Sequence, residues 1–218
     1  MFRKGNHLLK ALMKINGRMN ASSSLISLLA LGILVGSICA EPLSNVRGIT
    51  LSTHRAGREL GDPAVLRGSF AQMKQAGANW VAVHPYARIQ QDGTVSSRGR
   101  KGEVRAYWTE PIRVAHEMGL KVCIKPHLAH WRSGFSWRGE IGFDKPEEWD
   151  RFWEGYITWI FAMADACADA DLFIVGTELD RTVGHESEWR SLISRVRARK
   201  TASVTFASNW DSFENVPF

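Results

Sequence analysis

The sequence predicts a parallel α/β fold of the (β/α)8-barrel type, of which about five strand–helix units are present. Short apolar runs, which suit strands buried on both faces, alternate with longer segments of helical apolar spacing. Polar and aromatic residues gather where the apolar runs end, as they do at the catalytic face of a barrel. A nucleotide-binding doubly wound fold is disfavoured, because no G-x-G-x-x-G follows the first strand and no P-loop occurs.

The first predicted strand covers residues 46–52. Asp62 then suits a helix N-cap with Pro63 at the first helical position, and Gly77 suits the position after the helix end. The second predicted strand, residues 79–86, ends in a histidine, a proline and a tyrosine. This order predicts one complete strand–helix–strand unit.

The next helix is expected over residues 110–118, with Pro111 at its start and Gly119 at its end. The third strand is predicted over residues 120–128. A long loop, residues 129–143, follows it and carries two tryptophans, Trp131 and Trp137. Loops after barrel strands build active sites, so this one is a candidate part of the site.

Asp144 and Pro146 are expected to open a long helix, and Ser187 is expected to cap a later one. The fifth strand is predicted over residues 203–209. The apolar stripe of the long helix consists of Trp149, Phe152, Trp153, Tyr156, Ile157, Ile160 and Met163.

The fourth predicted strand lies in the stretch Asp171–Asp180. Its apolar run, Leu172–Val175, is followed by Gly176, Thr177 and the carboxylate of Glu178. A carboxylate at the carboxyl end of a barrel strand is a candidate catalytic group. The alternative is that Glu178 only begins a solvated loop.

Residues 1–40 have the pattern of a secretory signal, and residues 41–218 are predicted to form the partial barrel domain. Five basic and no acidic residues come first, then the apolar run Leu25–Ile38, then the small residue Ala40. The predicted location is secreted or periplasmic. A retained N-terminal anchor is the alternative, and it would be the chain's one attachment to a membrane.

Without this segment the chain has 23 basic and 22 acidic residues, a net charge of +1. The alkaline isoelectric point therefore belongs to the N-terminal segment, and nucleic acid is not expected as a partner. The remaining cysteines, Cys123 and Cys167, lie in a strand-like and a helix-like run, which predicts two buried thiols. No histidine or cysteine spacing indicates a metal site.

Four motifs resemble the retaining glycoside hydrolases with a clan-A TIM barrel, and most closely the family 113 β-mannanases. They are KPHLAHWRSGFSWRGEI, IVGTELDRT, EWRSLISRVR and SVTFASNWD, and the resemblance spans residues 47–218. In that clan the general acid/base ends the fourth strand, which implies this role for Glu178. Many members have Asn before this Glu, whereas this chain has Thr177.

The resemblance implies hydrolysis of a β-linked polysaccharide, with β-mannan favoured. Retaining hydrolysis uses two carboxyls about 5–5.5 Å apart and needs no metal or organic cofactor. The clan's nucleophile ends the seventh strand, and no residue here matches it, so a partial barrel is expected. A non-catalytic carbohydrate-binding protein and an inactive truncated remnant are the alternatives.

The predicted substrate-binding residues lie at strand ends or in the Trp-rich loop. Histidines that end apolar strands are often core residues, but two on one barrel face favour hydrogen bonding to sugar. Loop tryptophans, Trp131 included, can stack on sugar rings. The predicted set is His84, His127, Trp137, Arg138, Asn209 and Trp210.

Overall fold

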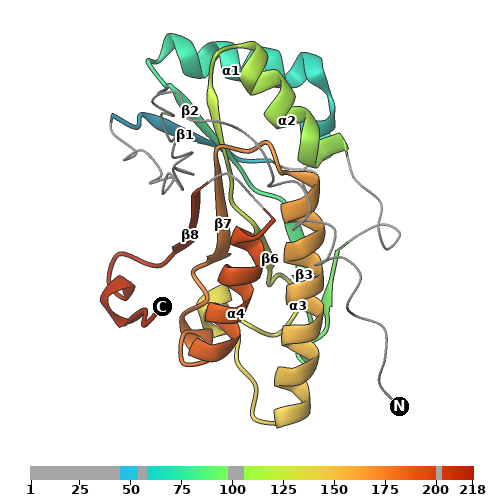
Figure 1. The fold of residues 1–218 in the computed structure, drawn as a ribbon. Coiled ribbons are helices and arrows are strands. Elements are labelled where there is room, and N and C mark those ends of the chain that lie inside the picture. The colour runs from blue at the N-terminus through green and yellow to red at the C-terminus, as the bar shows by residue number, and fades with distance from the viewer. Residues whose placement is uncertain (1–44, 54–57, 98–105, 200–202) are drawn as a thin grey trace, which may run out of the picture. The chain divides into compact units, whose positions relative to one another are not determined.

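The predicted apolar runs form one parallel sheet in the computed structural model, which describes residues 45–53, 58–97, 106–199 and 203–218 (Figure 1). Its strands lie side by side in chain order, so each unit of the chain adds one strand next to the last. They are β1 (Gly48–Leu51), β2 (Trp80–Val83), β5 (Lys121–Ile124), β7 (Leu172–Thr177) and β8 (Ser203–Ala207). The predicted fold class is confirmed.

In the described ranges, four α-helices connect these strands: α1 (Pro63–Gln75), α2 (Ala106–Glu117), α3 (Pro146–Ala166) and α4 (Glu186–Arg197). The predicted cap of α1 is confirmed, since Asp62 Oδ1 accepts a hydrogen bond of 2.9 Å from the backbone N–H of Ala64. The predicted stripe of α3 is largely buried against the sheet. Helices α3 and α4 lie alongside each other next to β7 and β8 (Figure 1).

Helix α2 begins four residues earlier than the sequence indicated. Pro111 lies inside the helix rather than at its start. A proline there cannot donate the backbone hydrogen bond of its turn, which is a local cost. Burial of the Trp108 ring, only 3% exposed, favours the longer helix because it places a large apolar surface in the core.

The predicted cap of α4 was also wrong. Helix α4 starts at Glu186, so Ser187 lies within its first turn, and the preceding residue, His185, makes no side-chain cap. The hydroxyl of Ser187 instead donates to Glu188 Oε2 at 2.6 Å. Two glutamates in this turn suit the positive end of the helix dipole, which favours an early start.

The second and third predicted strands each break at a proline, Pro85 and Pro126. Proline has no N–H for a sheet ladder, so the main sheet ends before it. After each proline the chain continues into a second sheet of three short strands. Its order is β4 (Val95–Ser96), β3 (Tyr86–Ile89), β6 (His127–Ala129), with β3 and β6 parallel.

Strand β7 is the best-buried strand of the main sheet, with every residue after Leu172 buried. The hydroxyl of Tyr156 in α3 donates to the carbonyl of Val175 at 2.7 Å. The indole N–H of Trp189 in α4 donates to the carbonyl of Thr182 at 3.0 Å. Two helices are thus joined by buried hydrogen bonds to β7 and to the turn that follows it.

Cys123 and Cys167 are both buried free thiols, as predicted. The predicted signal, residues 1–40, lies outside the described residues. Within the part of the chain that the structure describes, no helix has the length and apolar character needed to cross a membrane.

Gly176 is expected to tolerate no side chain. A Cβ built there would lie 2.6 Å from the rings of Trp189 and Phe206, and Trp189 is fully buried. Gly176→Ala should lower the free energy of unfolding by about 1–3 kcal/mol, measured by urea denaturation, because the core would be overpacked. Gly184→Ala is the matched control, since nothing lies within 4 Å of its Cβ position. Equal effects of the two changes would contradict the expectation.

Candidate active site

The candidate site lies at the carboxyl ends of the parallel strands. His84 follows β2, His127 begins β6 just beyond β5, Glu178 follows β7, and Asn209 lies beyond β8. Parallel strands direct these ends to the same edge of the sheet. The predicted site residues therefore come from neighbouring strands rather than from scattered surfaces.

The strand register changes just before Glu178. Ile174 pairs with Thr205 and Thr177 pairs with Ala207, so β7 advances three residues while β8 advances two. Bulges of this kind re-aim side chains and occur next to active sites. The bulge thus alters the direction in which β7 presents the residue that follows it.

Glu178 has a left-handed backbone, with φ of +53°. Its N–H donates to the carbonyl of Ala207 at 2.8 Å, which fixes this conformation against β8. A non-glycine residue here costs of order 1–3 kcal/mol and is found where the surrounding structure over-determines it. The carboxylate of Glu178 is therefore held at this point at a cost in the stability of the folded chain.

Arg138 is the ionic partner of Glu178. Its Nη1 donates to Glu178 Oε2 at 2.6 Å, and the two side chains are 16% and 30% exposed. Arg138 begins a 3₁₀ turn, Arg138–Glu140, in the loop after β6. Arg138 is in the predicted substrate-binding set, and in this structure its guanidinium binds the carboxylate of Glu178.

The Trp137 ring lies over Gly139. A Cβ at Gly139 would lie 2.0 Å from the ring, so only glycine leaves room for it. The side chain of Ser136 donates to Glu140 Oε2 at 2.6 Å and closes the same turn. These contacts give the Trp-Arg-Gly-Glu motif a physical reason: they hold the turn from which Arg138 reaches Glu178.

His84 and His127 form a stacked pair. Their ring centroids are 4.3 Å apart with planes at 12°, and both side chains are buried. Burial, together with the positive charge of Lys125 and Arg138, lowers the pKa of His84 to about 4. Burial and the neighbouring His84 lower the pKa of His127 to about 2. Both imidazoles are therefore neutral at pH 7 and can each offer one donor and one acceptor.

Several buried polar atoms at this edge have no hydrogen-bond partner. Among the described residues they include both ring nitrogens of His127, Nδ1 of His130, Nε of Arg138 and Oγ1 of Thr177. Leaving such an atom unpaired costs about 1–3 kcal/mol. Unpaired buried groups at one end of a sheet identify a surface suited to a polar ligand.

Asn209 makes contacts that the sequence did not indicate. Its Nδ2 lies 3.2 Å from both carboxylate oxygens of Asp180, and Ser212 Oγ donates to Oδ2 of the same carboxylate. Asn209 thus joins the loop after β8 to the turn after Glu178. Trp210, next along the chain, is 87% exposed. No pattern in the sequence could have paired residues 29 positions apart.

Within the described ranges, no group of three or more His, Cys, Asp or Glu side chains could hold a metal ion. The chemistry available at the site is that of a carboxylate, a guanidinium and neutral imidazoles. These groups can exchange a proton with a bound molecule and form hydrogen bonds to its hydroxyls.

The family comparison matches residues 62–218 to Glycoside Hydrolase Family 113. The chain belongs to this family. Three solved structures are similar to it, each over 79% of this chain. A GH113 β-1,4-mannanase in a complex has 26% identity and a TM-score of 0.67. A GH113 β-mannanase from Alicyclobacillus acidocaldarius in complex with ManMIm has 27% identity and a TM-score of 0.68.

The third, another GH113 β-1,4-mannanase structure, has 24% identity and a TM-score of 0.67, and supports the fold alone. This family 113 chain spans 57–58% of the length of the three matched structures. No curated protein sequence matches it.

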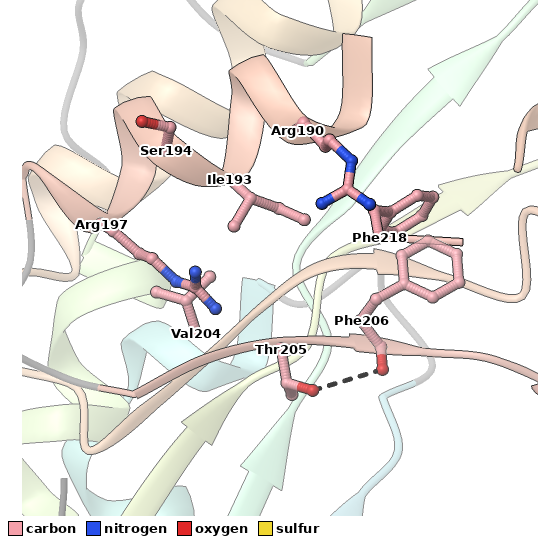
Figure 2. Close-up of a pocket in the computed structure, with 8 residues that line it drawn as sticks. All are labelled: Arg190, Ile193, Ser194, Arg197, Val204, Thr205, Phe206 and Phe218. Atoms are coloured by element: carbon pink, nitrogen blue, oxygen red, sulfur yellow. Dashed lines mark hydrogen bonds between the residues drawn. The ribbon is translucent and has the colours of Figure 1, made fainter. Parts of the chain in front are cut away.

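A separate hollow of about 340 Å³ lies between α4 and β8 of this family 113 chain (Figure 2). None of the predicted site residues lines it, so it is distinct from the strand-end site. Figure 2 shows α4 arginines beside an apolar surface that includes the rings of Phe206 and Phe218. The residues around it are Arg190, Ile193, Ser194, Arg197, Val204, Thr205, Phe206 and Phe218.

The histidine pair is expected to make stability fall in acid. In the folded chain both histidines have pKa values below the ordinary 6.5. Between pH 6.5 and about 4 these histidines therefore take up protons in the unfolded chain but not in the folded chain. The contribution of the pair to the free energy of unfolding is fully present above pH 6.5 and is lost as the pH falls. From pH 7 to pH 5, the wild type should lose about 1–2 kcal/mol more unfolding free energy than His127→Gln. Equal losses in urea denaturation would contradict this.

The left-handed conformation of Glu178 can be tested with two substitutions that both remove the carboxylate. Glu178→Gly should be more stable than Glu178→Ala by about 1 kcal/mol, because glycine adopts positive φ without the Cβ clash. The loss of the Arg138 ion pair is common to both variants and cancels in the comparison. Thermal denaturation measures the difference, and an alanine variant of equal stability would show that the backbone carries no strain.

Proposed function

We propose that this chain is a glycoside hydrolase domain that acts on β-1,4-linked mannan by a retaining mechanism, with Glu178 as the general acid/base. Family membership and two similar β-mannanase structures above 25% identity support the reaction class and the substrate. Because the chain spans 57–58% of those structures, the activity is a proposal for this chain.

The observation that carries the proposal is the placement of Glu178. It follows the fourth strand of the main sheet, after a bulge and in a left-handed conformation. Its side chain is neither exposed on the surface nor buried in the core, being 30% exposed. A glycosidase acid/base needs such a position, because it must reach the glycosidic oxygen while shielded from bulk water.

Arg138 would orient the carboxyl group. It binds Oε2, so Oε1 is the oxygen assigned to proton transfer with the glycosidic oxygen. Charge-assisted hydrogen bonds of this kind fix geometry more strongly than neutral ones. Arg138 is thus a positioning residue in the proposal, and Trp137 with Gly139 holds its turn in place.

His84 and His127 would bind sugar hydroxyls. A sugar hydroxyl is both donor and acceptor, and a neutral imidazole provides the complementary pair of groups. The unpartnered nitrogens of His127 are the ones that most need such a partner. Asn209 uses its amide N–H groups on Asp180, so a contact from Asn209 to substrate would come from its carbonyl oxygen.

Retaining hydrolysis also needs a second carboxyl as nucleophile, and the proposal assigns this role to no residue of the chain. Secretion or a periplasmic location is proposed on the pattern of residues 1–40. The non-catalytic alternative is binding of mannan by the same residues without bond cleavage.

The proposal is tested by reducing sugar released from β-1,4-mannan. Glu178→Gln should lower the rate at least about 100-fold, because it removes the transferable proton and nearly preserves the shape. Glu154→Gln, an exposed change on α3, is the matched control and should keep full activity. Unchanged hydrolysis by Glu178→Gln would reject the acid/base assignment. Mannan binding without hydrolysis, by wild type and Glu178→Gln alike, would favour the non-catalytic alternative.

A further inference from the structure

We propose that Trp131 and Tyr86 form a stacking site for one sugar ring of a β-linked chain, beyond the group around Glu178. This inference rests on the proposed function and deepens it. It predicts that the protein prefers oligosaccharides long enough to reach from the Glu178 group to Trp131.

The Trp131 ring is exposed but held in place. It is 59% exposed, and its centroid lies 5.5 Å from that of Tyr86 and 5.7 Å from that of His130. An indole ring that contacts neighbouring rings and is still more than half exposed presents a flat apolar surface to solvent. Such surfaces stack on the C–H faces of sugar rings, and the polar edges of Trp and Tyr can bind hydroxyls.

The turn that carries Trp131 is constrained. The N–H and the hydroxyl of Ser133 both donate to the carbonyl of His130, at 2.9 and 2.5 Å. Arg132, next to Trp131, has φ of +67°, which costs free energy for a residue with a Cβ. Gly134 has φ of +91° and lies so close to Gln91 that a Cβ would meet its amide at 2.0 Å. The fold holds this turn in one unfavourable conformation that displays an exposed tryptophan.

Ring contacts connect this surface to the candidate active site. Tyr86 pairs in register with His127 across β3 and β6, and their ring centroids are 5.7 Å apart. His127 stacks on His84, and Arg138 acts electrostatically on both rings and is bound to Glu178. The aromatic surface is therefore continuous with the polar groups proposed to bind sugar, as a polymeric substrate requires.

Trp210 provides the internal comparison. It is 87% exposed, and among the described residues it makes no ring–ring contact. An unrestrained side chain loses more conformational entropy when a ligand orders it, which lowers affinity. Trp131, whose ring is restrained by Tyr86 and His130, is therefore the better surface for stacking a sugar ring. The sequence alone did not distinguish the two tryptophans.

The proposal is tested by calorimetric binding of β-1,4-linked mannobiose and mannohexaose to the full chain, with Glu178→Gln present throughout so that neither sugar is cleaved during the titration. The wild type in this comparison is the chain that carries only this change. The wild type should bind mannohexaose more tightly than mannobiose. Trp131→Ala should weaken mannohexaose binding roughly tenfold and leave mannobiose binding unchanged, since one stacked aromatic contributes about that much. Trp131→Phe should restore part of the affinity. Phe213→Ala is the matched control and should bind both sugars like the wild type, because Phe213 is an aromatic residue of similar exposure, 60%, that the proposal does not use. Trp210→Ala is measured beside it as the competing platform.

Each outcome has one meaning. Wild-type affinity for mannohexaose in Trp131→Ala would overturn the stacking site while leaving the proposed function intact. A loss seen in Trp210→Ala instead would assign the platform to Trp210 and overturn this inference. A wild-type chain that binds neither sugar would reject the proposed function and the stacking site with it. Thermal denaturation checks that the exposed substitutions leave the fold unchanged.

Discussion

The structure depends on the burial of strand β7 between its two neighbouring strands and the helices that pack on it. Its residues from Phe173 onward are buried, and β5 and β8 pair with its two edges. Helix α3 adds a buried hydrogen bond from Tyr156 to Val175, and α4 adds one from Trp189 to Thr182. Burial of this kind leaves the strand few alternative positions, because protein interiors are close-packed. The residue that ends the strand is consequently fixed.

That residue is Glu178, and three local features act on it together. A bulge turns the strand, the backbone adopts a left-handed conformation, and Arg138 binds the carboxylate. Each feature has a free-energy cost, either in strain or in taking charge out of water. The stability of the core around β7 offsets these costs. The locally unfavourable features thus occur together at the residue that is proposed to be the general acid/base of this family 113 chain.

The rest of the site is built on the two short strands that follow Pro85 and Pro126. These prolines end the main sheet and turn the chain into a second sheet, which brings Tyr86 beside His127. The same arrangement stacks His127 on His84 and places Trp131 next to Tyr86. The ending of β2 and β5 before a proline therefore positions both the polar groups and the aromatic surface of the candidate site.

The sequence by itself determined the strand and helix order, the buried strand before Glu178 and the family, because apolar periodicity and short motifs are local properties. It misplaced the start of α2, where burial of Trp108 outweighed the preference of Pro111 for a helix start. Only the tertiary structure decided that Arg138 binds Glu178, that Asn209 binds Asp180 and that Trp131 is held while Trp210 is not. Those contacts join residues from different strand–helix units. Their geometry is set by packing, which no local pattern encodes.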